Sequence, residues 1–321
     1  MNALAILRAG PATSVQDAGR QGFLRYGVTP AGPMDWIAHR TANILAGNPS
    51  GGAAIEIGPG GLIVTAEGGP LSLGISAGGF RVSRDGSALP TRAAVTLAPG
   101  SRLEIAPGRS RLWAYLSPAG GFAVAPVMGS FATHQHSGIG PFGGGWIASG
   151  MVLPVATPAR AGAGEAGLFD PDPPAEGPIR FIPGPQDDYF TADALALFAS
   201  QTYRVAARSD RMAFRLAGPS LAHAKGHDIV SDGIAMGAIQ VPGDGLPLIL
   251  MADRQPTGGY PKLGTVIRAD LPRLAQTRPG EALRFAPVPV AEAVAALRAA
   301  IPDPTELRGR WRPMRSVRPG P

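Results

Sequence analysis

The sequence contains no cysteine, which excludes several classes of site. Disulfide bonds, thiolate catalysis, and zinc or iron–sulfur centres held by cysteine all need a thiol. Charged residues are scarce, at 16% of the chain against a usual share of about 25%. No apolar run approaches the roughly eighteen residues of a membrane span, and no charged region precedes the short apolar run at the start. We therefore expect a cytoplasmic protein with no membrane partner.

Positive charge is concentrated at one end of the chain. The formal net charge is +6, but residues 308–321 contain five arginines and no acidic residue. Without this tail, 24 basic residues face 23 acidic ones, so the rest of the chain is almost neutral. A nucleic-acid-binding surface needs basic residues gathered on a folded face. The sequence therefore predicts no nucleic-acid partner, and it predicts a tail that buries little and is dispensable to the fold.

Glycine and proline are abundant, with 45 and 34 residues in a chain of 321. Both residues favour tight turns, because glycine accepts positive φ and proline fixes φ while removing a backbone donor. This composition predicts a mainly β protein with a few short helices. The length suggests about two domains, and a Pro-, Ala- and Gly-rich stretch at 154–178 indicates a linker. We expect a first β unit with the linker at 1–170, and a second β unit with a C-terminal helix and the basic tail at 171–321.

Hydrophobic patterning and turn residues predict the individual elements. Asp35 is a candidate N-cap for a helix that Gly47 ends, and Asp270 a candidate N-cap for a short helix ending near Gln276. Two more helices are expected at 191–200 and 291–300. The expected strands are 3–8, 61–66, 71–76, 93–97, 101–106, 111–117, 179–182, 213–216, 246–252 and 262–268.

Two short matches suggest that the β units are related. Residues 99–107 align without a gap to residues 279–287, as a Pro-Gly turn followed by an alternating strand. Ala31-Gly32-Pro33 recurs as Ala217-Gly218-Pro219 at nearly the same offset. A shared offset predicts a duplicated β architecture.

Histidine and phosphate-binding patterns give little support for a cofactor. His134 and His136, and likewise His223 and His227, have spacings that metal ligands can use, but no carboxylate accompanies the first pair nearby. The sequence has no Gly-Lys-Ser or Gly-Lys-Thr of a standard phosphate loop. We therefore predict no metal site and no cofactor bound by this chain alone.

The most unusual segment is 231–262, where an apolar run ends abruptly in polar residues and glycines. Asp253, Gln255, Tyr260 and Lys262 follow the expected strand 246–252, while Gly258 and Gly259 permit close backbone approach. Such a strand end can build a site for a polar amide or carboxylate. The alternative is a decorated hairpin whose polar side chains only satisfy loop amides.

Several motifs resemble the biotin-dependent carboxyltransferase family. The similarity extends in order over roughly residues 5 to 286, and its Gln-Val-Pro and Gly-Gly-Tyr-Pro blocks are specific. Pro256 stands where a threonine is common in that family, Asp232 stands where glutamate is common, and segment 131–145 also departs from the usual pattern. The motifs are 14–20 (Ser-Val-Gln-Asp-Ala-Gly-Arg), 32–35 (Gly-Pro-Met-Asp), 42–43 with 47–48, 184–186 (Gly-Pro-Gln), 237–242 (Gly-Ala-Ile-Gln-Val-Pro) and 253–262.

The resemblance implies a fold of cyclophilin-like β-barrel units and a function within a complex. That function is to open 5-oxoproline to L-glutamate with ATP, together with a related smaller subunit and a separate third subunit. This chain alone is then inactive, and the complex uses the ATP. One alternative is biotin-dependent carboxyl transfer to urea or another amide, and another is a regulatory role in which the chain binds a signalling kinase.

The resemblance locates the site but not the chemistry of each side chain. We assign catalytic roles to Asp253, Gln255 and Lys262. Lys262 suits a substrate carboxylate, while Asp253 or Gln255 suits a ring amide. The residues expected to bind substrate are Gln240, Gly258, Gly259, Tyr260 and Asp35.

Overall fold

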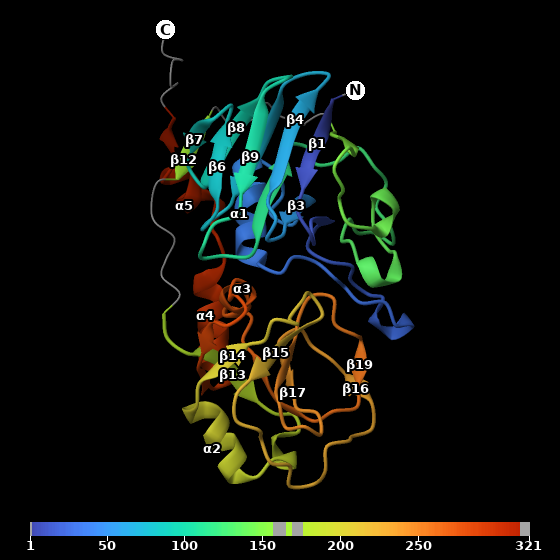
Figure 1. Cartoon of the computed structure of the whole chain (residues 1–321), viewed down its shortest axis with the longest axis vertical. Coiled ribbons are helices and arrows are strands. Elements are labelled where there is room, and N and C mark those ends of the chain that lie inside the picture. Colours follow the sequence, from blue (N-terminus) through green and yellow to red (C-terminus); the bar gives the residue numbers. More distant parts are fainter. Residues whose placement is uncertain (1, 157–164, 169–175, 315–321) are drawn as a thin grey trace. The chain divides into compact units, whose positions relative to one another are not determined.

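The computed structural model describes residues 2–156, 165–168 and 176–314 (Figure 1). The chain forms two compact units, each built from separate stretches of sequence. Unit 1 comprises Met1–Arg20, Trp36–Pro173 and Pro302–Pro321, and unit 2 comprises Gln21–Asp35 and Pro174–Ile301. The predicted boundary between residues 170 and 171 lies outside the described residues.

Unit 1 contains a six-stranded antiparallel sheet that begins with the first strand of the chain. Its strand order is β11-β1-β4-β9-β6-β7. The strands are β1 (Ala3–Ala9), β4 (Leu62–Glu67), β6 (Arg81–Arg84), β7 (Ser87–Leu89), β9 (Arg102–Ala106) and β11 (Val152–Pro154).

A seven-stranded sheet forms the second layer of unit 1, in the order β2-β3-β10-β5-β8-β12-β23. The last two strands come from residues far along the chain, because β23 pairs with β12 and β12 pairs with β8. The strands are β2 (Ser14–Gln16), β3 (Ala54–Ile57), β5 (Leu71–Ser76), β8 (Arg92–Leu97), β10 (Ala114–Pro118), β12 (Ala166–Leu168) and β23 (Arg312–Pro313).

The core of unit 1 lies between these two sheets. Leu103 and Ile105 alternate with more exposed residues along β9, and they belong to the same apolar cluster as Ile55 on β3 and Leu73 on β5. This period of two places one face of each strand in the core. The two sheets therefore form a packed sandwich.

Helix α1 (Trp36–Ala46) lies against the seven-stranded sheet, where it contacts β5 and β10 (Figure 1). A Cβ atom on Gly74 would stand 2.1 Å from the carbonyl oxygen of Ala42 and 2.4 Å from the amide nitrogen of Ala46. Only glycine lets the strand and the helix approach this closely. The helix ends as predicted before Gly47, whose φ is 79°.

Unit 2 is built around an eight-stranded, nearly closed barrel sheet in the order β21-β14-β15-β18-β17-β20-β13-β22. A separate two-stranded ribbon pairs β16 with β19. The strands are β13 (Ile179–Pro183), β14 (Tyr203–Val205), β15 (Ala213–Ala217), β16 (Asp232–Gly233), β17 (Ala238–Gln240), β18 (Leu248–Leu250), β19 (Thr257–Gly258), β20 (Lys262–Val266), β21 (Ala282–Leu283) and β22 (Phe285–Pro287).

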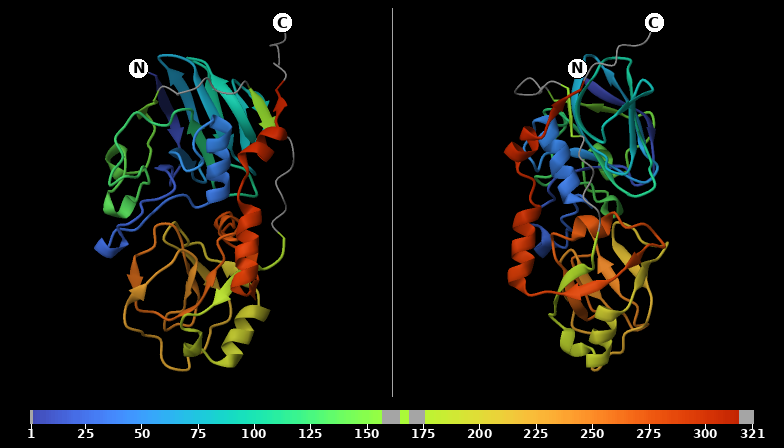
Figure 2. Two further views of the ribbon diagram at one scale, coloured as in Figure 1. Left: turned by 180° about the vertical axis from the view of Figure 1, so that it is seen from behind. Right: turned by 90° about the vertical axis from the view of Figure 1, so that its left-hand side faces the viewer.

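Two helices run along the outside of the unit 2 strands (Figure 2). Phe198 of α2 (Ala192–Ser200) stacks on Phe285 with ring centroids 4.6 Å apart, and it also contacts Tyr203. Ala293 of α4 (Val290–Ala300) packs with Ile267 in a smaller cluster. The remaining helices are α3 (Leu271–Ala275), α5 (Pro304–Gly309) and the 3-10 turns η1 (Leu24–Tyr26), η2 (Gln135–Ser137), η3 (Phe142–Gly144) and η4 (Asp187–Tyr189).

The predicted fold class is confirmed, because the chain is mostly β with few helices. The two segments of the sequence repeat form different secondary structure. Residues 99–107 contain the antiparallel β9, whereas residues 279–287 contain β21 and β22, and β22 pairs with β13 in parallel. In the part of the chain that is described, no helix is long and apolar enough to cross a membrane.

In its described part, residues 308–314, the basic tail has no buried residue, as expected, but it does contact the rest of unit 1. Leu307 is buried, Trp311 packs against Leu307, Ile44 and Leu168, and β23 extends the seven-stranded sheet. The composition of the tail predicts little burial, because arginine and proline are mostly exposed in folded proteins. It cannot show that one tryptophan among them finds an apolar partner.

Candidate functional site

The polar segment 253–262 comes soon after β18, as the sequence predicts. Residues 251–254 are still buried, Gln255 is exposed, and the chain then enters the β16–β19 ribbon. The strand itself is shorter than the predicted 246–252, with bounds Leu248–Leu250. The segment therefore changes from core to surface within a few residues.

Gln240 and Lys262 lie opposite each other on the neighbouring strands β17 and β20. The pairing shifts by one residue at this position, between Ile239 and Gln240, which marks a β-bulge. Gln240 is 1% exposed, and its Nε2 donates to the carbonyl oxygen of Tyr260 at 3.3 Å. Bulges re-aim side chains at the end of a ladder. The bulge thus brings two predicted site residues, Gln240 and Lys262, together.

The Lys262 ammonium is the centre of a polar cluster. Its side chain is 4% exposed, and Nζ donates to Asp232 Oδ2 at 3.0 Å. Gln186, which follows β13, accepts from the Lys262 backbone N–H at 3.1 Å and donates through Nε2 to the same Asp232 oxygen at 3.4 Å. The backbone N–H of Gln186 also donates to the Lys262 carbonyl at 3.2 Å. Strands β13, β16 and β20 therefore meet at one carboxylate.

Asp232 differs from Lys262 in exposure, because 52% of its side chain is accessible. The hydrogen bond from Lys262 is the main reason that the pKa of Asp232 lies below its usual value, and the N–H of Gly233 adds to this effect. The Asp232 carboxylate is therefore ionised at neutral pH. The cluster pairs one exposed anion with one buried cation.

Gly258 lies next to Gln240, and together with Gly259 it forms what we call the glycine wall. A Cβ atom on Gly258 would stand 2.7 Å from Ile234 Cδ1 and 2.9 Å from Gln240 Nε2. A Cβ on Gly259 would stand 3.2 Å from the carbonyl oxygen of Ile229. A side chain at position 258 would thus require the ends of the Ile234 and Gln240 side chains to shift.

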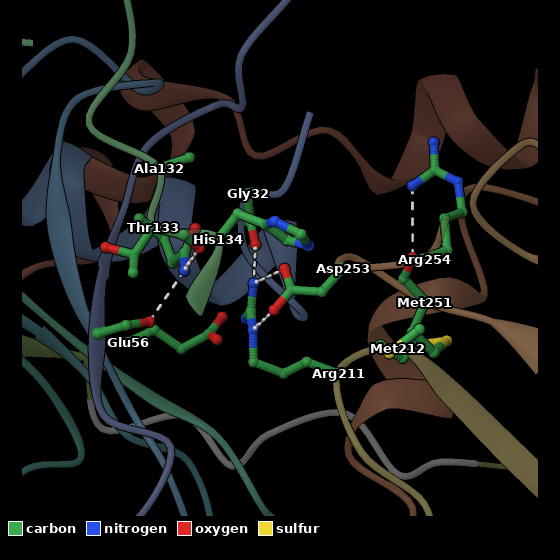
Figure 3. A network of polar contacts seen from close by, with 12 residues as sticks. Gly32, Glu56, Ala132, Thr133, His134, Arg211, Met212, Met251, Asp253 and Arg254 are labelled. Carbon is green, nitrogen blue, oxygen red and sulfur yellow. Dashed lines mark hydrogen bonds and ion pairs between the residues drawn. The ribbon is translucent and has the colours of Figure 1, made fainter. Parts of the chain in front are cut away.

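The Asp253 carboxylate, for which the sequence predicts a catalytic role, contacts a buried arginine. Its two carboxylate oxygens accept from Arg211 Nε at 2.9 Å and Arg211 Nη2 at 2.8 Å, and the side chains of Arg211 and Asp253 are only 4% and 2% exposed (Figure 3). Arg211 Nη2 also donates to the carbonyl oxygen of Gly32 at 2.9 Å. The Asp253–Arg211 pair thereby fastens segment Gln21–Asp35 to the rest of unit 2.

The other predicted residues are placed as follows. Gln255 is exposed, Tyr260 is 40% exposed, and Asp35 is buried with a carboxylate that accepts from Gln276 Nε2 at 2.8 Å. The structure therefore gathers Gln240, Gly258 and Lys262 in one cluster, whereas Asp253 and Asp35 contact Arg211 and Gln276.

Sequence reasoning misses two members of the cluster, Gln186 and Asp232. Both stand in or beside motifs that resemble the carboxyltransferase family, so the sequence does mark these positions. Their convergence depends on β13 pairing with β20, which brings together residues 76 positions apart. Arg254 is also absent from the predicted site. It is buried, donates to the carbonyl oxygens of Ile234 and Met251, and burial lowers its pKa to about 10.

The motif at 14–20 has a structural role within unit 1. Gln16 donates to a carbonyl in segment 130–133 at 3.0 Å, Arg20 donates to another at 2.8 Å, and Asp17 accepts an N–H of that segment at 2.7 Å. His39 of α1 contacts the Gln16 carbonyl oxygen at 3.2 Å, and burial lowers its pKa to about 4. These side chains hold a loop against β2.

The candidate histidine pairs make other contacts. His134 Nδ1 lies 2.9 Å from Ser137 Oγ, and His223 Nε2 lies 3.1 Å from the carbonyl oxygen of Val241. Across residues 2–156, 165–168 and 176–314, no three His, Asp or Glu side chains are grouped to hold a metal ion.

The comparison with protein families decides the relationship. Residues 26–287 match the family described as carboxyltransferase domain, subdomain A and B. The chain belongs to this carboxyltransferase family. The family resemblance seen in the sequence motifs is thereby confirmed.

Curated relatives of this carboxyltransferase-family chain fall into two groups. It is 34% identical to the C subunit of 5-oxoprolinase from Escherichia coli, covering 91% of this chain and 94% of the relative. The identity is 31% to the C subunit of 5-oxoprolinase from Haemophilus influenzae, covering 90% and 92%. It is 30% identical to urea amidolyase of Saccharomyces cerevisiae, covering 89% of this chain but 17% of the relative.

Solved structures of longer proteins share the fold. The crystal structure of TTHA0988 matches with a TM-score of 0.79 at 31% identity, covering 89% of this chain. The carboxyltransferase-family chain spans about half the length of that protein, 55%. Urea amidolyase of K. lactis matches with a TM-score of 0.83 at 26% identity, covering 93% of this chain and 20% of the longer one.

Proposed function

We propose that this chain is one subunit of an ATP-dependent complex that opens 5-oxoproline to L-glutamate. The observation that carries the proposal is the match to the C subunit of E. coli 5-oxoprolinase over 94% of that protein. The urea amidolyase of S. cerevisiae matches over 17% of its length, so this chain corresponds to one segment of that enzyme. The first relationship covers 91% of this chain and 94% of the relative, so the two proteins correspond over almost their full lengths.

The Lys262 cluster supports the proposal because its chemistry suits a small polar ring with a carboxylate. Lys262 binds the substrate carboxylate, and Gln240 with the glycine wall at 258 and 259 holds the ring amide. Gln255 and Tyr260 lie at the exposed end of the same segment, where they contact the substrate from the solvent side. Asp253 acts through Arg211 as a positioning residue. The substrate-binding role of Asp35 still rests on the sequence alone.

Ring opening adds water across an amide bond that resonance stabilises, so the carbonyl must be polarised and the reaction coupled to ATP. The chain contains no standard phosphate-loop sequence. We therefore assign ATP use to the complex and propose that this chain has no turnover alone. Its partners are a related smaller subunit and a separate third subunit, and we place the complex in the cytoplasm.

A specific observation also favours biotin-dependent carboxyl transfer to urea or another amide. The structure of Kluyveromyces lactis urea carboxylase matches 93% of this chain with a TM-score of 0.82. In that function, the same cluster binds an amide and a carboxyl group carried by biotin. The third alternative, a regulatory role in which the chain binds a signalling kinase, is supported by no further observation.

The deciding experiment reconstitutes the chain with the two proposed partner subunits and measures glutamate release and ADP formation with 5-oxoproline. We expect glutamate from the complete complex and none from the chain alone. Urea-dependent carboxylation with a biotin-carrying partner, and no glutamate, would replace the first function by the second. Equal turnover by the isolated chain would refute its role as one part of a complex.

The site assignment has its own test in the reconstituted complex. Lys262→Met, Gln255→Ala and Tyr260→Phe each remove a polar group from the segment. If all three variants keep the wild-type rate, the segment is scaffold and the assignment fails.

A further inference from the structure

Two donors converge on a single carboxylate oxygen in the Lys262 cluster. Lys262 Nζ lies 3.0 Å and Gln186 Nε2 lies 3.4 Å from Asp232 Oδ2. The orientation of the Gln186 amide follows from its other contact, because its Oε1 accepts the backbone N–H of Lys262. An ammonium and an amide N–H₂ aimed at one oxygen form a receptor for a carboxylate.

The two charged groups of this receptor are held very differently. Lys262 begins β20, an interior strand of the eight-stranded sheet, and its side chain is 4% exposed, so a neighbouring anion stabilises its ammonium. Asp232 lies on the two-residue strand β16, and 52% of its side chain is exposed. Water can solvate the Asp232 carboxylate after a side-chain rotation, whereas it cannot reach Lys262 as easily. Asp232 is therefore the partner that can leave.

We propose that Asp232 is an internal stand-in for the substrate carboxylate, which displaces it from Lys262 and Gln186 on binding. The inference rests on the proposed function, since it concerns how that site takes a small carboxylate. Asp232 acts as a specificity-determining residue. A ligand without a carboxylate cannot replace the anion on Lys262, so the ring alone gains no access to the buried ammonium.

Lysine composition makes this exchange directly observable. The chain contains two lysines, and Lys225 is exposed and pairs with Asp188. A full-length chain labelled at lysine therefore gives two side-chain signals by NMR, which the Lys262→Met variant assigns. The probes are 5-oxoproline and 2-pyrrolidinone, the same ring without a carboxylate. They are added to the labelled chain alone and then with its unlabelled partner subunits and no ATP.

We expect 5-oxoproline to shift the Lys262 signal and to leave Lys225 unchanged, while 2-pyrrolidinone shifts neither. Asp232→Asn removes the competing charge and should lower the dissociation constant of 5-oxoproline about fivefold, the scale of an exposed ion pair. Asp232→Glu keeps the competing charge and serves as the matched control, with a dissociation constant near that of the wild type.

Two results would overturn the inference. One is an Asp232→Asn variant that binds 5-oxoproline no more tightly than the wild type, which would make Asp232 a fixed part of the site. The other is a Lys262 signal that no probe moves in either preparation. If the complex still releases glutamate in that case, the proposed function stands and only the exchange is wrong. If the complex releases no glutamate, the proposed function is wrong, and this outcome is independent of the NMR result.

Discussion

Replacing Asp253 with asparagine tests whether this predicted catalytic residue holds the fold instead. Asp253 is 2% exposed, Arg211 is 4% exposed, and two hydrogen bonds of 2.9 and 2.8 Å join them. Asparagine keeps the volume but removes the carboxylate that accepts both hydrogen bonds from the buried Arg211 guanidinium. Breaking a buried pair from one side costs about 3–5 kcal/mol. For a unit of this size, such a loss lowers the unfolding midpoint by roughly 10 °C.

Differential scanning calorimetry of the full chain measures this midpoint. Asp188→Asn is the matched control, since it also removes a carboxylate from an ion pair, but from one in which the acid and its partner Lys225 are both exposed. The control should leave the midpoint nearly unchanged. If Asp253→Asn unfolds at the wild-type temperature while the reconstituted complex loses activity, Asp253 is catalytic and the positioning argument is refuted.

Three further predictions concern other parts of the molecule. Lys262→Met should lower kcat/KM of the complex about 10- to 100-fold, the range of a hydrogen bond to a charged group, whereas Lys225→Met should not; equal rates would contradict the site. His39 has a folded-state pKa of about 4, below its unfolded value of 6.5, so the unfolded state binds a proton more readily and the free energy of unfolding falls as the pH falls. We expect a loss of about 2 kcal/mol between pH 7 and 5, measured by urea unfolding. The His39→Asn variant should not show this loss. Truncation after Leu307 should cost about 2–3 kcal/mol, because Trp311 loses its apolar contacts, and Trp311→Ala should reproduce most of that loss; an unchanged melting curve would show that the tail contributes nothing.

The sequence predicts an element correctly where residues close together in the chain determine its structure. The strand at 71–76 and the helix that ends before Gly47 follow from alternation and from the residue types at their ends. Strand β3 is absent from the predicted strands because Glu56 interrupts its apolar run. In the structure, the Glu56 carboxylate is buried and accepts from Tyr115 Oη at 2.6 Å. That partner lies 59 residues away, so no local rule could supply it.

In the candidate site, too, local features can be predicted from the sequence, whereas contacts between distant residues cannot. The sequence indicates Gln240, Gly258 and Lys262, because a strand ending in polar residues and glycine is a local feature. It cannot show that Asp253 is committed to Arg211, which lies 42 residues earlier. Nor can it show which acid faces Lys262, since that depends on how the β16–β19 ribbon meets β20. Strand pairing, and not residue type, separates the two aspartates.

The discontinuous make-up of the two units has a consequence for synthesis of the chain. Residues 21–35 leave the ribosome early but must wait for Arg211 and Asp253, which bind Gly32 through Arg211. Unit 1 in turn lacks β23 and Trp311 until residues 311–313 have been synthesised. Unit 2 therefore receives its last residues before unit 1 does, although unit 1 contains most of the first half of the sequence. A nascent chain halted near residue 173 would hold neither unit complete, so co-translational folding of the N-terminal half must pass through a sheet whose edge strand β12 still lacks its partner β23.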